Sequence, residues 1–196
     1  MTSAHALTLA DIVPPAEYAR DRKAWKQKIG AIKRVRRIPV GPYVTFYFEC
    51  RDTMWLQVQE MMYIEKGGMA QAPDELAAYN PLIPNGSELT ATFMIEIDDP
   101  IRRAAVLATL GGIEESAVLR IGGETIVGVA EADQDRTRED GKASSVQFVH
   151  FPFTPAQIEM FRNGAGEATL GFTHARYGHM AILETATRAA LAKDFD

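Results

Sequence analysis

The chain has 196 residues, of which 24% are charged and 46% hydrophobic, a composition typical of a globular protein with a sizeable core. Its formal charge of −5 argues against a general nucleic-acid-binding protein, since such domains usually carry a basic excess. The single cysteine, Cys50, excludes an internal disulfide and any multi-cysteine metal site within one chain. We therefore expect a reducing, cytoplasmic setting, and the absence of a membrane-length apolar run predicts no membrane association.

A first helix is predicted from about residue 14 to residue 37, beginning at Pro14-Pro15. Its apolar residues recur at helical spacing and predict a buried stripe: Tyr18, Trp25, Ile29 and Ile32. Its other face is basic: Arg20, Arg22, Lys23, Lys26, Lys28, Lys33, Arg34, Arg36 and Arg37. We interpret this face as a solvated helix surface, with an acidic partner, a phosphate or nucleic acid as the functional alternatives.

A strand from Val44 to Glu49 is predicted to run directly into a helix from Met54 to Lys66, because period-2 alternation gives way to helical periodicity. Asp52 or Thr53 is expected to cap this helix. Glu60 lies within its largely apolar pattern, where it could act as a general base or metal ligand. We favour an ion pair with Arg51, Lys66 or a basic residue of the first helix, because an unpaired buried carboxylate is costly.

The rest of the chain alternates between predicted strands and helices. The predicted strands are 88–97, 117–121, 125–131, 144–153 and 167–174, and the predicted helices begin near residues 73, 100, 154 and 183. Gly122-Gly123 predicts a hairpin between two of the strands. This pattern favours an α+β fold with a mainly antiparallel sheet and helices packed over one face. We expect a single globular domain over residues 1–196, on whose body the first helix packs.

Two histidines fall on predicted strands and could meet Glu60 in one polar pocket. These are His150 and His174. In the charged loop between two predicted strands, Arg136 and Arg138 could bind an anion, with Asp140 orienting one guanidinium. Glu60, His150 and His174 could also hold iron, manganese or zinc, although their spacing matches no metal motif. The residues predict no particular cofactor.

Several short segments, in the same order along nearly the whole chain, carry a resemblance. They are Arg36-Arg37-Ile38, Val40-Gly41, residues 48–53, 57–61, 79–80, Pro84, 88–92, 136–140, 149–152 and 174–177. As a set they resemble a bacterial family of proteins of unknown function, domain of unknown function 3501. Members are often encoded beside rubrerythrin-like and iron–sulfur proteins, which implies a redox or oxidative-stress context and a redox or iron–sulfur protein as partner. Cys50 stands where the family is expected to have asparagine, so it is not a family-wide reactive group.

Together these observations favour an accessory or small-anion-binding protein of redox metabolism. Two alternatives stay open. One is an enzyme with Glu60 or His150 as general base, with or without a divalent metal. The other is a protein-interaction module that uses the basic first helix. Assembly into a homo-oligomer is compatible with each of the three.

Overall fold

The computed structural model describes residues 5–131, 142–164 and 166–196. Its helices are α1 (Pro15–Arg34), α2 (Arg51–Glu65), α3 (Ala72–Tyr79), α4 (Pro100–Leu107), α5 (Pro155–Arg162) and α6 (Thr185–Leu191). Its strands are β1 (Arg37–Val40), β2 (Val44–Phe48), β3 (Glu88–Ile95), β4 (Ala117–Ile121), β5 (Glu124–Val127), β6 (Val129–Ala130), β7 (Val146–Pro152), β8 (Ala168–Phe172) and β9 (Met180–Ile182).

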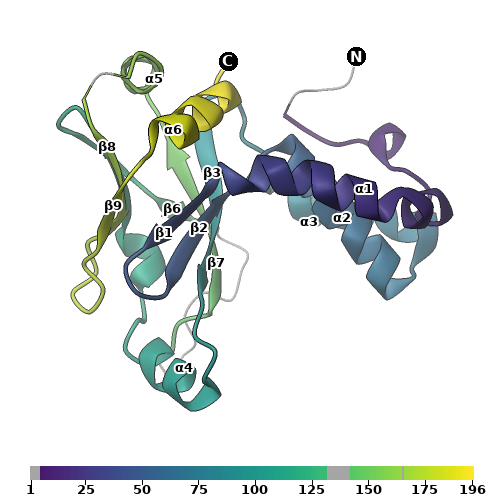
Figure 1. Cartoon of the computed structure of the whole chain (residues 1–196), viewed down its shortest axis with the longest axis horizontal. Helices are drawn as coiled ribbons and strands as arrows, with labels where there is room; N and C mark the ends of the chain where they lie inside the picture. The colour runs from purple at the N-terminus through teal and green to yellow at the C-terminus, as the bar shows by residue number, and fades with distance from the viewer. Residues whose placement is uncertain (1–4, 132–141, 165) are drawn as a thin grey trace.

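The strands form two antiparallel sheets (Figure 1). The first sheet has the order β1-β2-β3-β7-β6, and the second has the order β5-β4-β8-β9. The predicted α+β class with antiparallel pairing is therefore confirmed, with the strands divided between two sheets. Sequence periodicity did not indicate this division, because it reports which face of a strand is buried and not which strand lies beside it.

The main core lies between the two sheets. The predicted apolar face of residues 88–97 is buried there at Leu89, Phe93 and their period-2 neighbours, but Thr90 and Thr92 on the other face are buried as well. The ring of Phe172 in the second sheet lies 5.1 Å from the ring of Phe93 and 5.0 Å from that of Phe46, both in the first sheet. Such aromatic contacts bury large apolar areas and hold the sheets together.

A second core holds α1, α2 and α3 together as a helical lobe, which projects to the right in Figure 1. Tyr18, Trp55 and Met62 are buried in it, and the Trp25 and Trp55 rings lie 4.7 Å apart. Phe148 of β7 packs against this cluster from the first sheet. The predicted apolar stripe of α1 is thus the face that joins the lobe.

Three parts of the secondary structure differ from the prediction. Strand β1 was not among the predicted elements, because it contains Pro39 and proline is a turn signal, but proline is tolerated on an edge strand. Helix α2 begins at Arg51, three residues earlier than predicted, because Thr53 Oγ1 accepts a hydrogen bond from the Cys50 amide at 2.9 Å. The predicted final helix from residue 183 begins at Thr185 and is divided into α6 and a short 3-10 turn over Ala192–Asp194.

Gly128 marks the point where the chain passes from one sheet to the other. The strand predicted over 125–131 is divided there into β5 of the second sheet and β6 of the first. A Cβ at Gly128 would lie 2.6 Å from Val149 Cγ2 and 3.1 Å from Ala117 Cβ. Only a residue without a side chain therefore fits this crossing without displacing the core.

We predict that Gly128→Ala lowers the free energy of unfolding by about 1–3 kcal/mol, because it overpacks a filled core. The matched control is Gly30→Ala within α1, where an added Cβ meets nothing within 4 Å. This control is expected to raise stability by about 0.5–1 kcal/mol through helix propensity. Urea unfolding of both variants measures the difference, and a Gly128→Ala protein as stable as wild type would contradict the account.

Candidate functional site

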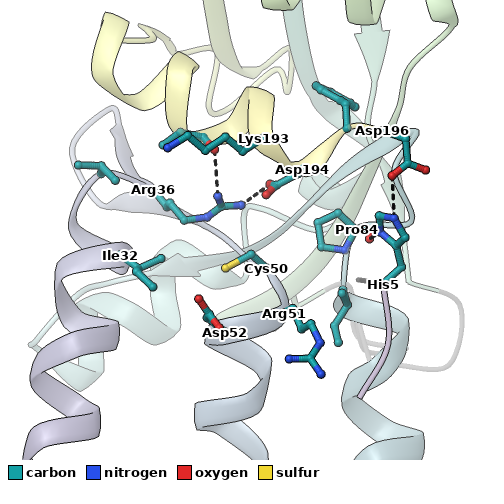
Figure 2. Close-up of a pocket in the computed structure, with 14 residues that line it drawn as sticks. His5, Ile32, Arg36, Cys50, Arg51, Asp52, Pro84, Lys193, Asp194 and Asp196 are labelled. Atoms are coloured by element: carbon teal, nitrogen blue, oxygen red, sulfur yellow. Dashed lines mark hydrogen bonds and ion pairs between the residues drawn. The ribbon is translucent and has the colours of Figure 1, made fainter. Parts of the chain in front are cut away.

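A pocket of about 620 Å³ lies where four segments distant in sequence meet. These are the N-terminal segment at His5, the end of α1, the start of α2 and the C-terminal residues 190–196. Residues Ile83 and Pro84 complete the lining. Figure 2 shows the Cys50 sulfur facing the space between Arg36 and Asp52.

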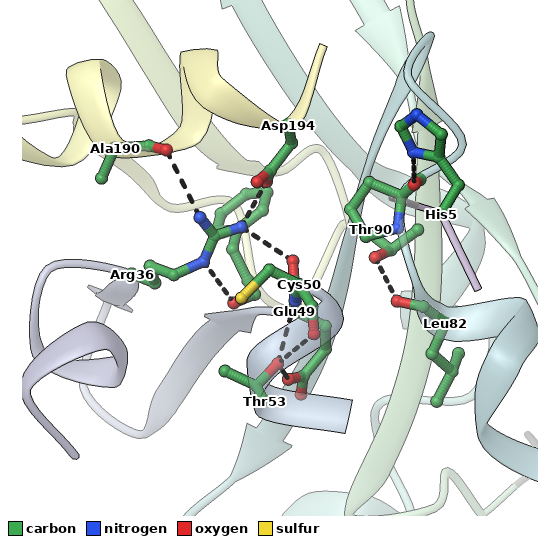
Figure 3. A network of polar contacts seen from close by, with 11 residues as sticks. His5, Arg36, Glu49, Cys50, Thr53, Leu82, Thr90, Ala190 and Asp194 are labelled. Carbon is green, nitrogen blue, oxygen red and sulfur yellow. Dashed lines mark hydrogen bonds and ion pairs between the residues drawn. The ribbon is translucent and has the colours of Figure 1, made fainter. Parts of the chain in front are cut away.

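One wall of the pocket is fixed by a buried ion pair between Arg36 and Asp194, whose side chains are 5% and 8% exposed. The Arg36 guanidinium also donates to the carbonyl oxygens of Phe48 at 3.0 Å and Glu49 at 2.7 Å (Figure 3). Burial raises the pKa of the Asp194 carboxyl above its usual range, and the charge of Arg36 opposes that rise. This pair attaches the C-terminal segment to the end of β2.

The buried carboxylate of Glu49 fixes the junction between β2 and α2. Glu49 accepts hydrogen bonds from Thr53 Oγ1 at 2.6 Å and from Thr92 Oγ1 at 2.8 Å. Because both donors are themselves buried, this network is shielded from competing water. It holds Cys50 and the first turn of α2 in place at the pocket.

His5 closes another side of the pocket. Its Nδ1 lies 2.7 Å from the Pro84 carbonyl oxygen and its Nε2 lies 2.8 Å from Asp196 Oδ1. Both partners only accept hydrogen bonds, so the doubly protonated imidazolium satisfies both contacts at once. The pKa of His5 is accordingly raised, mainly by the hydrogen bond to the Pro84 backbone.

Three more charged residues, Arg51, Asp52 and Lys193, also line the pocket. Arg51 is paired with Asp11 at 2.6 Å. Lys193 is exposed, and within the described part of the chain no carboxylate lies within 4 Å of its ammonium group. The N-terminal end of α2 adds partial positive charge at the same place.

Glu60, the first predicted site residue, lies between α1 and α2. Arg22 donates two hydrogen bonds of 2.7 Å to its two oxygens, Tyr18 donates one of 2.5 Å, and Lys26 lies 3.3 Å away. These contacts, led by Arg22, lower the pKa of Glu60 to about 2. The expected pairing with basic residues of the first helix is confirmed, and it holds two helices of the lobe together.

The two predicted histidines have separate surroundings. His150 of β7 lies 3.2 Å from Glu88 and 3.0 Å from Glu131, one carboxylate at each ring nitrogen. His174 follows β8; its Nε2 lies 3.3 Å from the Gly111 carbonyl oxygen. Among the described residues, no hydrogen bond or ion pair joins either histidine to the other or to Glu60.

The remaining predicted site residues, Arg136, Arg138 and Asp140, lie outside the described residues, so the shared pocket of the six stays a prediction. Within the described ranges, no group of three or more His, Cys, Asp or Glu side chains is placed to hold a metal ion. No described helix combines the length and the apolar character that a membrane crossing requires.

The residues that line the observed pocket are not among the site residues predicted from the sequence. His5, Arg36, Lys193, Asp194 and Asp196 lie at the two ends of the chain or after the first helix. They belong to no motif, because tertiary contacts across more than 150 residues bring them together. The sequence carries no signal for them, because Arg36 is one of nine cations in and just after the first helix and nothing local distinguishes it.

Glu60→Gln is expected to lower the free energy of unfolding at neutral pH by about 1–2 kcal/mol, through loss of the ion pair. Since the folded-state pKa of Glu60 is below its ordinary value of 4.5, this stabilisation is present above pH 4.5 and is lost as the pH falls toward 2. Unfolding curves at several pH values check this. Equal stability of the variant and an exposed control, Glu115→Gln, at pH 7 would refute it.

The stabilisation that His150 provides is expected to depend on pH in the opposite way to that of Glu60, being larger at low pH. Its pKa is raised, mainly by the hydrogen bond to Glu88, so the stabilisation is complete below the ordinary histidine pKa of 6.5 and is lost as the pH rises through the folded-state pKa. His150→Gln should therefore destabilise the protein more at pH 6 than at pH 9. Thermal unfolding at both pH values measures this, and a pH-independent difference would contradict it.

The comparisons with known proteins agree with this fold. A family model described as "Protein of unknown function (DUF3501)" matches residues 6–195. A crystal structure of a novel protein of unknown function from Burkholderia pseudomallei K96243 is similar with a TM-score of 0.90 and 31% sequence identity, covering 97% of this chain and 100% of that one. A search of curated proteins gave no match. The chain therefore belongs to the DUF3501 family of proteins of unknown function.

Proposed function

We propose that this protein is an accessory protein that binds a small acidic molecule in the pocket between α2 and the C-terminal segment. The observation that carries the proposal is the convergence of Lys193, the start of α2 and a preformed wall on one hollow of about 620 Å³. Pockets of this size accommodate small-molecule ligands. A ligand that brings one acidic group would offer Lys193 a partner that the chain itself does not supply within 4 Å among its described residues.

The charges around the pocket favour a ligand with a single negative charge. The carboxylates of Asp194 and Asp196 are already engaged, by Arg36 and His5 respectively. Asp52 is exposed at the lining and would repel a second anionic group nearby. A monocarboxylate or a singly charged phosphate ester therefore fits better than a polyanion.

The redox context belongs to this proposal and rests on the family resemblance. In that context the bound molecule is a metabolite of redox or oxidative-stress reactions, and the partner is a redox or iron–sulfur protein. The geometry favours binding over the enzymatic alternative, because the polar groups of the pocket wall hold one another in ion pairs and hydrogen bonds. Such arrangements orient a ligand, whereas a general base must be available to accept a proton.

Cys50 provides a direct test, since it lines the pocket and is the single thiol of the chain. We predict that anionic iodoacetate alkylates Cys50 faster, relative to neutral iodoacetamide, than it alkylates cysteine amide in solution. Lys193→Gln should lower this rate ratio by about threefold, the effect of one exposed charge at short range. Mass spectrometry of the alkylated protein over time gives both rates.

The matched control is Lys66→Gln, which removes an exposed lysine at the far end of α2 and should leave the ratio unchanged. A second readout uses acetate and inorganic phosphate as competitors, which should slow alkylation of wild type more than of Lys193→Gln. If the ratio is the same in wild type and in cysteine amide, or falls equally in both variants, the pocket has no preference for anions and the proposal fails.

A further inference from the structure

The N-terminal segment passes along one side of the Cys50 pocket and is firmly attached just after His5 (Figure 2). Leu7 is buried, with 3% of its surface exposed, and its amide donates a hydrogen bond of 2.8 Å to Asn80 Oδ1. Asn80 Nδ2 donates in return to the Leu7 carbonyl oxygen at 3.0 Å. Residues 5–7 therefore form a short strap that is held at Leu7 and reaches the pocket with His5.

His5 docks on two other segments that contact each other without it. The Asp196 amide donates to the Gly86 carbonyl oxygen at 3.0 Å, and Phe195 forms a β-bridge with Gly86. The φ of Gly86 is +91°, and a Cβ at this position would collide with the Asp196 carboxylate, so a glycine is required for this close approach. The Pro84 carbonyl and the Asp196 carboxylate are thereby presented to His5 as two neighbouring acceptors.

His5 satisfies both acceptors at once only as the imidazolium. Its Nδ1 lies 2.7 Å from the Pro84 carbonyl oxygen, and its Nε2 lies 2.8 Å from Asp196 Oδ1. A neutral imidazole has a single N–H, so it must give up one of the two contacts. Because the pKa of His5 is raised above its ordinary value of 6.5, both contacts are present below pH 6.5 and one is lost as the pH rises through the folded-state pKa.

The elements around His5 carry other ionisable groups, which affect Cys50 as well. Residues 83–86 contain none. In the C-terminal segment and at the start of α2, Asp194 and Arg51 are held in ion pairs, and the other ionisable residues that line the pocket are Cys50, Asp52 and Lys193. Loss of the positive charge of His5 would by itself make the Cys50 thiol harder to ionise and so less reactive.

We propose that residues 5–7 are a proton-dependent strap at the Cys50 pocket, closed while the His5 imidazolium bridges Pro84 and Asp196 and loosened when His5 is neutral. The two acceptors stay in place through the contact of Asp196 with Gly86, so the strap moves and its docking surface does not. The pocket is consequently more accessible at mildly alkaline than at mildly acidic pH. As a means of regulating ligand access, the strap rests on the proposed ligand-binding function of the pocket.

The strap is tested by the accessibility of Cys50 to an uncharged thiol reagent, methyl methanethiosulfonate. Wild type and His5→Ala are treated between pH 5.5 and pH 8.5, and mass spectrometry follows the modification over time. At pH 5.5 His5→Ala should react about threefold faster than wild type, the effect of one partly exposed charged contact. The ratio of the two rates should fall toward one at pH 8.5, where wild type has lost the bridging imidazolium.

A control variant and a second measurement separate the strap from other effects of histidine. The control is His179→Ala, which removes an exposed histidine outside the pocket lining and should leave the rate unchanged at each pH. The second measurement is an NMR titration of the His5 ring, whose pKa should lie above 6.5 in wild type and be lower in Asp196→Asn. Circular dichroism verifies that each variant is folded.

Three results would overturn the proposal. The first is an equal or slower reaction of His5→Ala at pH 5.5, which is what the loss of charge alone would give. The second is a rate ratio that does not change with pH, and the third is the same His5 pKa in wild type and Asp196→Asn. Failure of the anion preference measured with iodoacetate would instead refute the ligand proposal and leave the strap standing, because methyl methanethiosulfonate is uncharged.

Discussion

The buried ion pair between Arg36 and Asp194 is the interaction on which the described pocket depends. Arg36 follows α1 and Asp194 lies near the C-terminus, so their contact joins segments separated by 158 positions. The guanidinium also binds the carbonyl oxygens of Phe48 and Glu49, which precede α2. Because breaking one partner of such a pair leaves an uncompensated buried charge, the arrangement is strongly held once it forms. It thereby fixes the C-terminal segment against the strand–helix junction that carries Cys50.

The two cores hold different parts of the molecule together. The sheets form a filled aromatic core in which Phe46, Phe93 and Phe172 interlock. The helical lobe is held by a smaller apolar cluster and by the ion pair of Glu60 with Arg22. The pocket lies where the start of α2, in the lobe, meets segments that pack on the sheets. The proposed ligand pocket therefore lies at the N-terminal end of α2, where the lobe meets the rest of the molecule.

The sequence allowed the prediction of features that depend on neighbouring residues. Periodicity and capping predict the β2–α2 unit and the apolar face of β3, and the cost of burying a charge predicts the partners of Glu60. Edge strand β1 was missed because Pro39 is a turn signal in one context and tolerated at a sheet edge in another. The assignment of strands to two sheets was missed for a related reason, since a glycine such as Gly128 shows its role only when its neighbours in space are known.

The observed pocket was not predictable by the same means. His5, Arg36, Cys50 and Asp196 are ordinary residues in the sequence, and their proximity results from contacts that no local pattern encodes. Residue-type reasoning instead selected Glu60, which the structure places in a helix–helix ion pair with a strongly lowered pKa. A carboxylate within an apolar helix face is thus a good indicator of a partner nearby and a poor indicator of a ligand site.

The central claim, that the Arg36–Asp194 pair holds the C-terminal segment in place as a pocket wall, is tested most directly by native-state hydrogen exchange of the Asp194→Asn protein. The account predicts that amides of α6 and the residues after it exchange at least about tenfold faster than in wild type, the ratio for about 1.4 kcal/mol of lost local stability, while amides of β3 keep their protection. Unchanged exchange in α6, or an equal increase throughout the molecule, would contradict it.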